Sequence, residues 1–484
     1  WVNGIFMGYS SSSKAYRVYN SKTKKIIVSR DVIFLDECAT NRAPEPVIQH
    51  QEEERLETIE DQNDIDDDDS DSEYDDANGD EAAAVQHHQP IEQFAALPSQ
   101  SEDPHKLVCK LNKALYGLKQ ASRVWDLKLD AELKRIGLKQ SIYDTCVYYK
   151  MNDRSILIVA VYVDDLLIFL NNDSWEKNLK KQLIKRFKMK DLGLANKVLG
   201  IRVTRADGVV MLDQEQYINA LLNCYGVAYC NTVRTPADPG QKLSKQMSPQ
   251  TEEERKQMEN VPYRELIGCL QYLAQGTRPD ISFAVNAVSH FCNDPGKAHW
   301  IAAKRILPYF KGTKTMKLMY NSTSDGNFEG FCDADWGNDT DNRHSITGYV
   351  MKQSGGPVAW NCRKQSTVAL STTEAKYMAV SAVTQESVWW KGFRQELLGC
   401  VEPVTIYCDN RSAIHLAEKQ IGYSSRSKHI DVRYHFVRQS IARILIQLKH
   451  VCSENQEADL LTKVLPVSKF ETGREALGIK PILD

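Results

Sequence analysis

The chain has 484 residues, 42% of them hydrophobic and 26% charged, with a formal net charge of −3 at pH 7. This composition suits a globular protein of about three domains. The longest apolar stretch, residues 155–170, is broken by two aspartates, which argues against a membrane-spanning helix. The 12 cysteines lack the pairing and spacing of a disulfide framework or a zinc site.

The N-terminal segment alternates short apolar runs with turns, at residues 4–9, 15–19 and 25–34. Such period-two patterning predicts β-strands, and three short strands predict a small all-β barrel over residues 1–37.

Residues 38–104 are rich in Asp, Glu, Gln, Pro and Ser and poor in large apolar side chains, so we expect a disordered linker. Within it, residues 51–81 hold 17 acidic residues and one arginine, a local net charge of −16. The rest of the chain therefore carries +13. A basic body of this kind predicts a polyanionic partner.

The next segment contains a predicted helix from Arg123 to Gly137 and then two apolar runs that flank a Tyr-Val-Asp-Asp sequence. Two strands joined by a tight turn would present Asp164 and Asp165 side by side at the tip of a hairpin. Adjacent carboxylates are costly to desolvate unless a cation compensates them. A divalent-metal site is one interpretation, and a solvent-exposed turn in an ordinary sheet is the other.

Further along, the pattern predicts alternating helices and strands. We expect a basic helix at 174–188, a hairpin at 197–212, a polar linker at about 235–260, helices at 262–275, 280–292 and 297–311, and a final αβ domain at 328–466 followed by a tail, 467–484.

Several motifs in this region occur in a characteristic order. They are residues 108–121 (VCKLNKALYGLKQA), 187–193 (FKMKDLG), 277–281 (TRPDI), 299–300 (HW) and 311–313 (KGT). Together with the Asp-Asp hairpin, they resemble the Pol polyproteins of copia-type long-terminal-repeat retrotransposons. The resemblance covers residues 106–466. Residues 4–37, which contain the motifs 8–10 (GYS) and 29–34 (SRDVIF), resemble the small SH3-like barrel behind that family's integrase.

The resemblance implies a multidomain fold. Its parts are an integrase-tail SH3-like barrel (1–37), the disordered acidic linker (38–104), a truncated α+β reverse-transcriptase palm (105–235), thumb or connection helices (236–327), an α/β RNase H-like domain (328–466) and the C-terminal tail (467–484). The implied activities are RNA-directed DNA synthesis and cleavage of RNA in RNA–DNA hybrids.

The resemblance also implies Mg²⁺ in two-metal sites, with RNA, DNA, RNA–DNA hybrid and dNTPs as partners and no membrane association. The implied location is the cytoplasm, in virus-like particles, with the nucleus as a second compartment.

In the RNase H-like domain, the resemblance identifies Asp333, Asp409 and Asp459 as catalytic and metal-binding carboxylates, as it does Asp164 and Asp165 in the palm. Metal-assisted hydrolysis needs carboxylates that converge on two ions about 3.5–4 Å apart. Taken singly, each aspartate could equally be a helix cap or a turn residue.

Basic residues near two motifs are candidates for nucleic-acid binding. They are Lys110, Lys113, Lys119, Gln120 and Arg123 in the first group, and Arg426, Lys428 and Arg433 in the second. Gln120 is the polar residue that we place nearest the base pair. Solvated helix charge is the alternative for each lysine and arginine.

Two departures from the family pattern concern activity. The polymerase of the family needs another Asp on a strand before residues 115–117, and residues 36–106 contain no apolar strand to hold one. We therefore expect no polymerase activity.

The second departure is Lys376, which occupies the position of the catalytic Glu within residues 371–379 (STTEAKYMA). An ammonium group there repels divalent ions, so we expect severely reduced RNase H activity. Glu374 is an alternative ligand, but positions i and i+2 do not share a helix face. Two further possibilities are a non-catalytic nucleic-acid-binding remnant and a host protein that uses the fold as an interaction scaffold.

Overall fold

The computed structural model describes residues 4–9, 16–20, 25–29, 120–152, 154–321, 327–419 and 431–481. The chain divides into two compact units, residues 1–127 and residues 128–484. The predicted linker, 38–104, lies outside the described residues.

The first unit contains a three-stranded antiparallel sheet in the order β1-β2-β3. Its strands are β1 (Gly4–Tyr9), β2 (Tyr16–Asn20) and β3 (Lys25–Ser29). The three expected strands are therefore present, with a register irregularity between Phe6 and Gly8 in β1.

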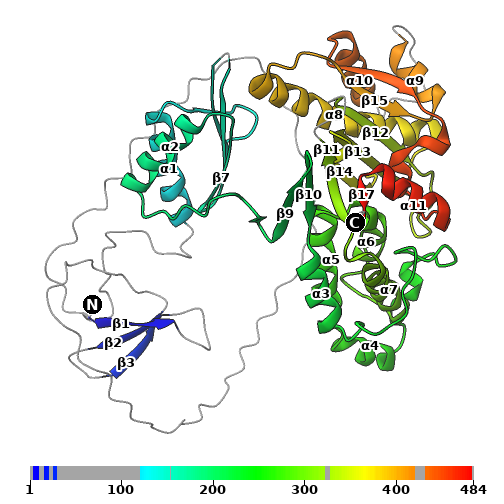
Figure 1. Ribbon diagram of the computed structural model, residues 1–484. Coiled ribbons are helices and arrows are strands. Elements are labelled where there is room, and N and C mark those ends of the chain that lie inside the picture. The colour runs from blue at the N-terminus through cyan, green and yellow to red at the C-terminus, as the bar shows by residue number, and fades with distance from the viewer. Residues whose placement is uncertain are drawn as a thin grey trace, which may run out of the picture. The chain divides into compact units, whose positions relative to one another are not determined.

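A four-stranded antiparallel sheet in the order β4-β5-β6-β7 follows (Figure 1). Its strands are β4 (Lys139–Gln140), β5 (Val147–Met151), β6 (Ile156–Tyr162) and β7 (Asp165–Leu170), accompanied by helices α1 (Ala121–Arg135) and α2 (Asp173–Arg186). In β6, Leu157 and Val159 are buried, and Leu179 and Leu183 form the buried stripe of α2. The spacing of two along the strand and of four along the helix places each pair of apolar side chains on one face of its element.

A third sheet joins segments that are distant in sequence, in the order β17-β11-β10-β9-β8. Its strands are β8 (Lys197–Val198), β9 (Ile201–Ala206), β10 (Val209–Asp213), β11 (Lys317–Asn321) and β17 (Ile479–Lys480). The β9–β10 hairpin turns at Asp207-Gly208, as expected. The C-terminal segment, which we expected as a tail, instead supplies helix α11 (Val467–Ala476) and the edge strand β17.

Helices between these sheets enclose one hydrophobic core. They are α3 (Glu215–Cys224), α5 (Tyr263–Gly276), η3 (Pro279–Ile281), α6 (Ser282–Ser289) and α7 (Lys297–Thr313). Two further helices, η2 (Lys245–Met247) and α4 (Glu252–Glu259), have no buried residues. Helix α4 lies where we expected a polar linker. It begins at a capping box in which Thr251 and Glu254 satisfy each other's backbone N–H groups.

The last sheet has five strands in the order β14-β13-β12-β15-β16. Strands β12 (Glu329–Ala334), β13 (Ile346–Gln353) and β14 (Gly356–Lys364) pair antiparallel, whereas β15 (Val404–Cys408) and β16 (Ile446–His450) continue parallel to β12. The accompanying helices are α8 (Thr372–Leu398), α9 (Arg411–Glu418), α10 (Asp431–Ala442), η5 (Ser453–Asn455) and η6 (Glu457–Leu461).

Helix α8 crosses this sheet and supplies much of its core (Figure 1). Tyr377, Val380 and Val383 are fully buried against residues of the sheet such as Cys332 and Ile406. No helix in the described part of the chain has both the length and the apolar character needed to cross a membrane.

Candidate functional site

The hairpin expected from the Tyr-Val-Asp-Asp sequence is formed by β6 and β7, with Tyr162 paired to Asp165. Val163 and Asp164 occupy the two turn positions, and Val163 has a φ of 55°. A β-branched residue with a positive φ is uncommon, so this tight turn is held in a strained conformation. Asp164 and Asp165 are both exposed at its tip.

A further carboxylate is needed to complete a metal site at this hairpin. Among the described residues, β7 is the outermost strand of its sheet, and no group of three His, Cys, Asp or Glu side chains is arranged to hold a metal ion. The two aspartates are therefore presented together but are joined by no third ligand in the part of the chain that is described.

Two of the three aspartates expected in the C-terminal domain are brought together by parallel strand pairing. Cys332 of β12 lies opposite Cys408 of β15, so Asp333 and Asp409, one residue further along, reach the same edge of the sheet. The carboxyl ends of parallel strands meet at one edge, which is why this pair could be expected from sequence.

The third aspartate reaches the site through a close approach of η6 to the sheet. A Cβ atom added at Gly348 of β13 would lie 2.7 Å from Leu461 Cβ and 2.7 Å from Thr462 Cγ2. Glycine thus permits the segment that carries Asp459 to pack directly on β13. Asp459 and Asp333 are both buried, at 1% and 0% exposure.

Lys376 of α8 joins the first two carboxylates. Its Nζ donates a hydrogen bond of 2.5 Å to Asp333 Oδ1 and one of 2.5 Å to Asp409 Oδ1. The side chain of Lys376 is 10% exposed. A buried lysine is stable only when its charge is compensated, and here two carboxylates compensate it.

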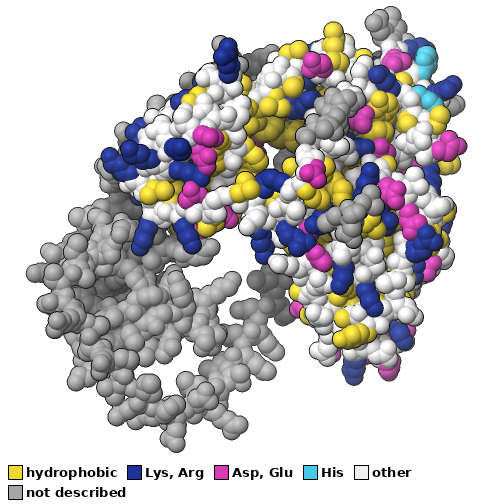
Figure 2. All heavy atoms as spheres, viewed as in Figure 1, with side chains coloured by type: hydrophobic (Ala, Val, Ile, Leu, Met, Phe, Trp, Pro, Cys, Tyr) yellow, Lys and Arg dark blue, Asp and Glu magenta, His cyan; other side chains and the backbone are white. Residues whose placement is uncertain are grey.

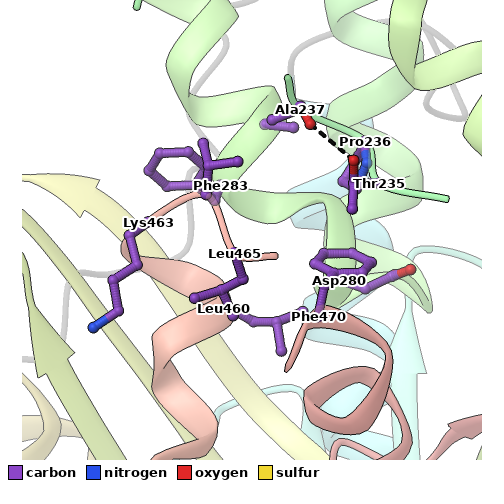
Figure 3. A pocket seen from close by; sticks show the side chains of 11 residues that line it. Thr235, Pro236, Ala237, Asp280, Phe283, Leu460, Lys463, Leu465 and Phe470 are labelled. Atoms are coloured by element: carbon purple, nitrogen blue, oxygen red, sulfur yellow. Dashed lines mark hydrogen bonds between the residues drawn. The ribbon is translucent and has the colours of Figure 1, made fainter. Parts of the chain in front are cut away.

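Two more lysines, which sequence reasoning missed, complete the cluster. Lys463 Nζ lies 3.3 Å from Asp333 Oδ2 and forms an ion pair of 2.8 Å with Asp459 Oδ1, and Lys469 Nζ donates to Asp459 Oδ2 at 2.6 Å. Figure 3 shows Lys463 extending away from the apolar side chains of Leu460, Leu465 and Phe470. These side chains line a cavity of about 10 Å³, which holds about one water molecule.

The electrostatics of the cluster follow from this geometry. Burial alone would raise the pKa of Asp333, but the ammonium groups of Lys376 and Lys463 hold that pKa well below its usual range. Burial opposes the charge of Lys376, and the two aspartates overcome it and raise the lysine pKa. Burial raises the pKa of Asp459, while Lys463 and Lys469 partly counter this effect. Asp333 and Lys376 are therefore held as an ion pair.

These residues do not fit Mg²⁺. The ion requires oxygen ligands at about 2.0–2.1 Å in near-octahedral geometry, whereas the facing oxygens of Asp333 and Asp409 both accept from the same ammonium group. A divalent cation and Lys376 cannot occupy this position together.

The predicted nucleic-acid-binding residues are only partly described. Gln120 and Arg123 are exposed and Arg433 is half-buried, while Lys110, Lys113, Lys119, Arg426 and Lys428 lie outside the described residues. Tyr434, next to Arg433, is buried and packs against Tyr377 with ring centroids 4.2 Å apart.

A basic face that we did not select from the sequence is visible in the structure. Figure 2 shows Lys and Arg side chains gathered over the surface that α1 and α2 form. On α2, Lys177, Lys181 and Lys185 recur at every fourth position and are all exposed, so they lie along one side of the helix.

Family models and relatives match most of the chain. A model described as reverse transcriptase (RNA-dependent DNA polymerase) matches residues 46–239, and one described as the retroviral polymerase SH3-like domain matches residues 2–47. The chain is 42% identical over 376 residues to a retrovirus-related Pol polyprotein from transposon TNT 1-94 of Nicotiana tabacum, covering 77% of this chain and 28% of that protein.

Two further relatives differ in how completely they are covered. The Pol polyprotein from transposon RE1 of Arabidopsis thaliana is 36% identical, over 78% of this chain and 25% of that protein. The putative transposon Ty5-1 protein of Saccharomyces cerevisiae is 31% identical, over 58% of this chain and 89% of that protein. The chain thus spans about a quarter of the length of the polyproteins that it matches.

Among solved structures, the crystal structure of LC11-RNase H1 in complex with RNA/DNA hybrid overlaps 28% of this chain and 94% of that one, at 10% identity and a TM-score of 0.22. At that score the overlap carries no argument for this chain.

Proposed function

Because this chain belongs to the family of copia-type, retrovirus-related Pol polyproteins of transposons, we propose that it is the reverse transcriptase and RNase H portion of such a polyprotein. The ancestral activities are RNA-directed DNA synthesis and hydrolysis of the RNA strand of RNA–DNA hybrids. Both are metal-assisted phosphoryl transfers. The six-part domain division and the disordered acidic linker that we expected from the sequence belong to this proposal.

The proposed site residues are Asp164 and Asp165 in the palm and Asp333, Asp409 and Asp459 in the RNase H-like domain. Support for the second set comes from its convergence, since three segments that are distant in sequence bring three carboxylates to one edge of a sheet. The palm pair is supported by its place at the tip of a tight hairpin.

In this copy, we propose that both activities are impaired. The polymerase site has two carboxylates on a hairpin and no third one among the described residues. In the RNase H-like domain, the contact of Lys376 with both Asp333 and Asp409 is the observation that carries the proposal. The ammonium group takes the position in which the reaction requires a divalent ion.

Nucleic acid remains the proposed partner, as RNA, DNA or RNA–DNA hybrid, with dNTPs for the intact polymerase. The exposed lysines of α2 support backbone binding, because Lys and Arg side chains bind phosphates without reading sequence. The proposed location is the cytoplasm, in virus-like particles, and the nucleus.

The contact of Lys376 with both aspartates favours a second candidate function, which is binding of nucleic acid without catalytic turnover. Fluorescence anisotropy of a labelled RNA–DNA hybrid with the full chain separates the possibilities, with cleavage followed on a gel in the same samples. We expect binding that weakens steeply with salt and no Mg²⁺-dependent cleavage. Cleavage by the natural chain would show that it is still an RNase H, and absence of binding would refute both functions.

A further inference from the structure

The carboxylate cluster of the C-terminal domain is already charge-balanced by side chains of this chain. Three aspartates, Asp333, Asp409 and Asp459, face three lysines, Lys376, Lys463 and Lys469. Each aspartate has at least one ammonium group within 2.8 Å. Such a cluster differs from a metal site, in which like charges repel one another until the cation binds.

Lys376 is the most buried of the three lysines. It arises from the interior face of α8, and its side chain is 10% exposed, whereas those of Lys463 and Lys469 are both 36% exposed. Its Nζ bridges carboxylates on two different strands, which is what a cation shared by Asp333 and Asp409 would do.

The remaining oxygens of these two aspartates are bound as well. Asp333 Oδ2 accepts from Thr462 Oγ1 at 2.6 Å, and Asp409 Oδ2 accepts from Ser453 Oγ at 3.3 Å. All four carboxylate oxygens thus have partners within the protein, so none of them requires a metal ion.

We infer that Lys376 is a built-in replacement for the divalent cation, which makes the fold of this domain independent of metal ions. The inference rests on the proposed function only in taking these three aspartates as the RNase H carboxylates. Its consequence is that removal of this ammonium group would make the stability of the domain depend on a divalent cation.

The physical argument concerns what remains after that removal. In a Lys376→Met variant, which keeps a long unbranched side chain, Asp333 and Asp409 lose their shared partner, and the fully buried Asp333 keeps only its longer ion pair with Lys463 at 3.3 Å. Removing the nearest counter-charge of a buried carboxylate is destabilising. A bound Mg²⁺ ion restores the balance, and any ligand that binds only the folded state raises its stability.

The test is the melting temperature of the full chain in excess EDTA and in millimolar MgCl₂. We expect the same value in both buffers for the natural protein, and for Lys376→Met a lower value in EDTA that Mg²⁺ raises by on the order of 5 °C. The control is Lys449→Met, which removes an exposed lysine from β16 of the same sheet and should behave as the natural protein does.

Two further measurements test the inference if Lys376→Met does not fold. Lys376→Arg keeps the positive charge and should stay insensitive to Mg²⁺. Isothermal titration with MnCl₂ should give the same result for the natural chain and for Lys376→Arg, because both keep a cation between Asp333 and Asp409. Tight Mn²⁺ binding by the natural chain that Asp333→Asn abolishes, or a Mg²⁺-dependent melting temperature, would overturn the inference while leaving hybrid binding, and therefore the proposed function, untouched.

Discussion

Glu374 and Lys376 lie two residues apart on α8, and their side chains contact different parts of the protein. Glu374 turns back to the start of the helix, where its carboxylate accepts from Leu370 N at 2.9 Å and its own backbone N–H donates to Ser371 Oγ at 3.2 Å. Lys376 faces the sheet and contacts Asp333 and Asp409. Glu374 is therefore a capping residue in this structure, and these contacts hold its carboxylate at the start of the helix.

The first prediction follows from this division of roles. Lys376→Glu exchanges the positive charge for a fourth carboxylate, so the variant should cleave the RNA of a labelled hybrid in MgCl₂ while the natural chain does not. The full chain is assayed, with Lys376→Gln as the neutral control. Equal cleavage by the natural chain and Lys376→Glu would mean that Lys376 does not block the site.

The second prediction concerns the basic face of α2. Replacing Lys177, Lys181 and Lys185 together by alanine should weaken hybrid binding, because each lost phosphate contact lowers the dependence of log K on log salt by about one unit. Anisotropy titrations at several salt concentrations measure both quantities. Arg255→Ala/Lys256→Ala on α4 is the control, and an unchanged slope in the triple variant would exclude α2 from the interface.

The third prediction concerns a fully buried ion pair. Arg278 donates to both carboxylate oxygens of Asp280, at 2.9 and 2.7 Å, and to Thr313 Oγ1 at 2.8 Å. Arg278→Met leaves Asp280 charged and buried, so we expect a loss of about 3–5 kcal/mol in the free energy of unfolding, measured by urea denaturation.

The matched control for Arg278 is a pair at the surface. Arg234 forms a comparable two-point contact with Glu471, but its side chain is 69% exposed. Arg234→Met should leave the free energy of unfolding almost unchanged, because water screens an exposed ion pair. Similar losses for the two variants would contradict the assignment of Arg278 as a buried structural residue.

The fourth prediction is a pH dependence. Burial lowers the pKa of His299 below its ordinary 6.5, although the backbone of Ser244 partly opposes this shift. Its Nδ1 accepts from Gly296 N at 2.9 Å, so the folded state holds the neutral ring. A depressed folded-state pKa gives stability that is present above pH 6.5 and is lost as the pH falls through the folded pKa.

His299→Asn tests this pH dependence because Asn can accept from Gly296 N but does not titrate. The difference in free energy of unfolding between the natural chain and the variant should be constant above pH 6.5 and should shrink below it. A difference that grows on acidification would contradict the neutral assignment.

Much of the fold could be predicted because its signals are local. The flanking apolar runs gave both strands of the Asp-Asp hairpin, and helices α1, α2, α5 and α7 lie within a few residues of their expected bounds. Helix α4 was missed even though its capping box, Thr251 to Glu254, can be read from the sequence.

What could not be predicted depends on approaches between distant segments. Strand β17 has two residues, too few for any periodicity, and it pairs with β11 about 160 residues earlier. Lys469 contacts Asp459 only because α11 folds back beside η6. Lys463 did offer a signal, since it follows Asp459 by four residues, the spacing of an ion pair on a helix.

The bridge that Lys376 makes between β12 and β15 also has an evolutionary consequence. A mutation that returned an acidic residue to this position would remove two hydrogen bonds and add a fourth negative charge to a crowded site. The first effect of reversion would be a less stable protein in any cell where metal was scarce. Under the proposed function, selection for a stable fold would therefore oppose the return of an acidic side chain at position 376.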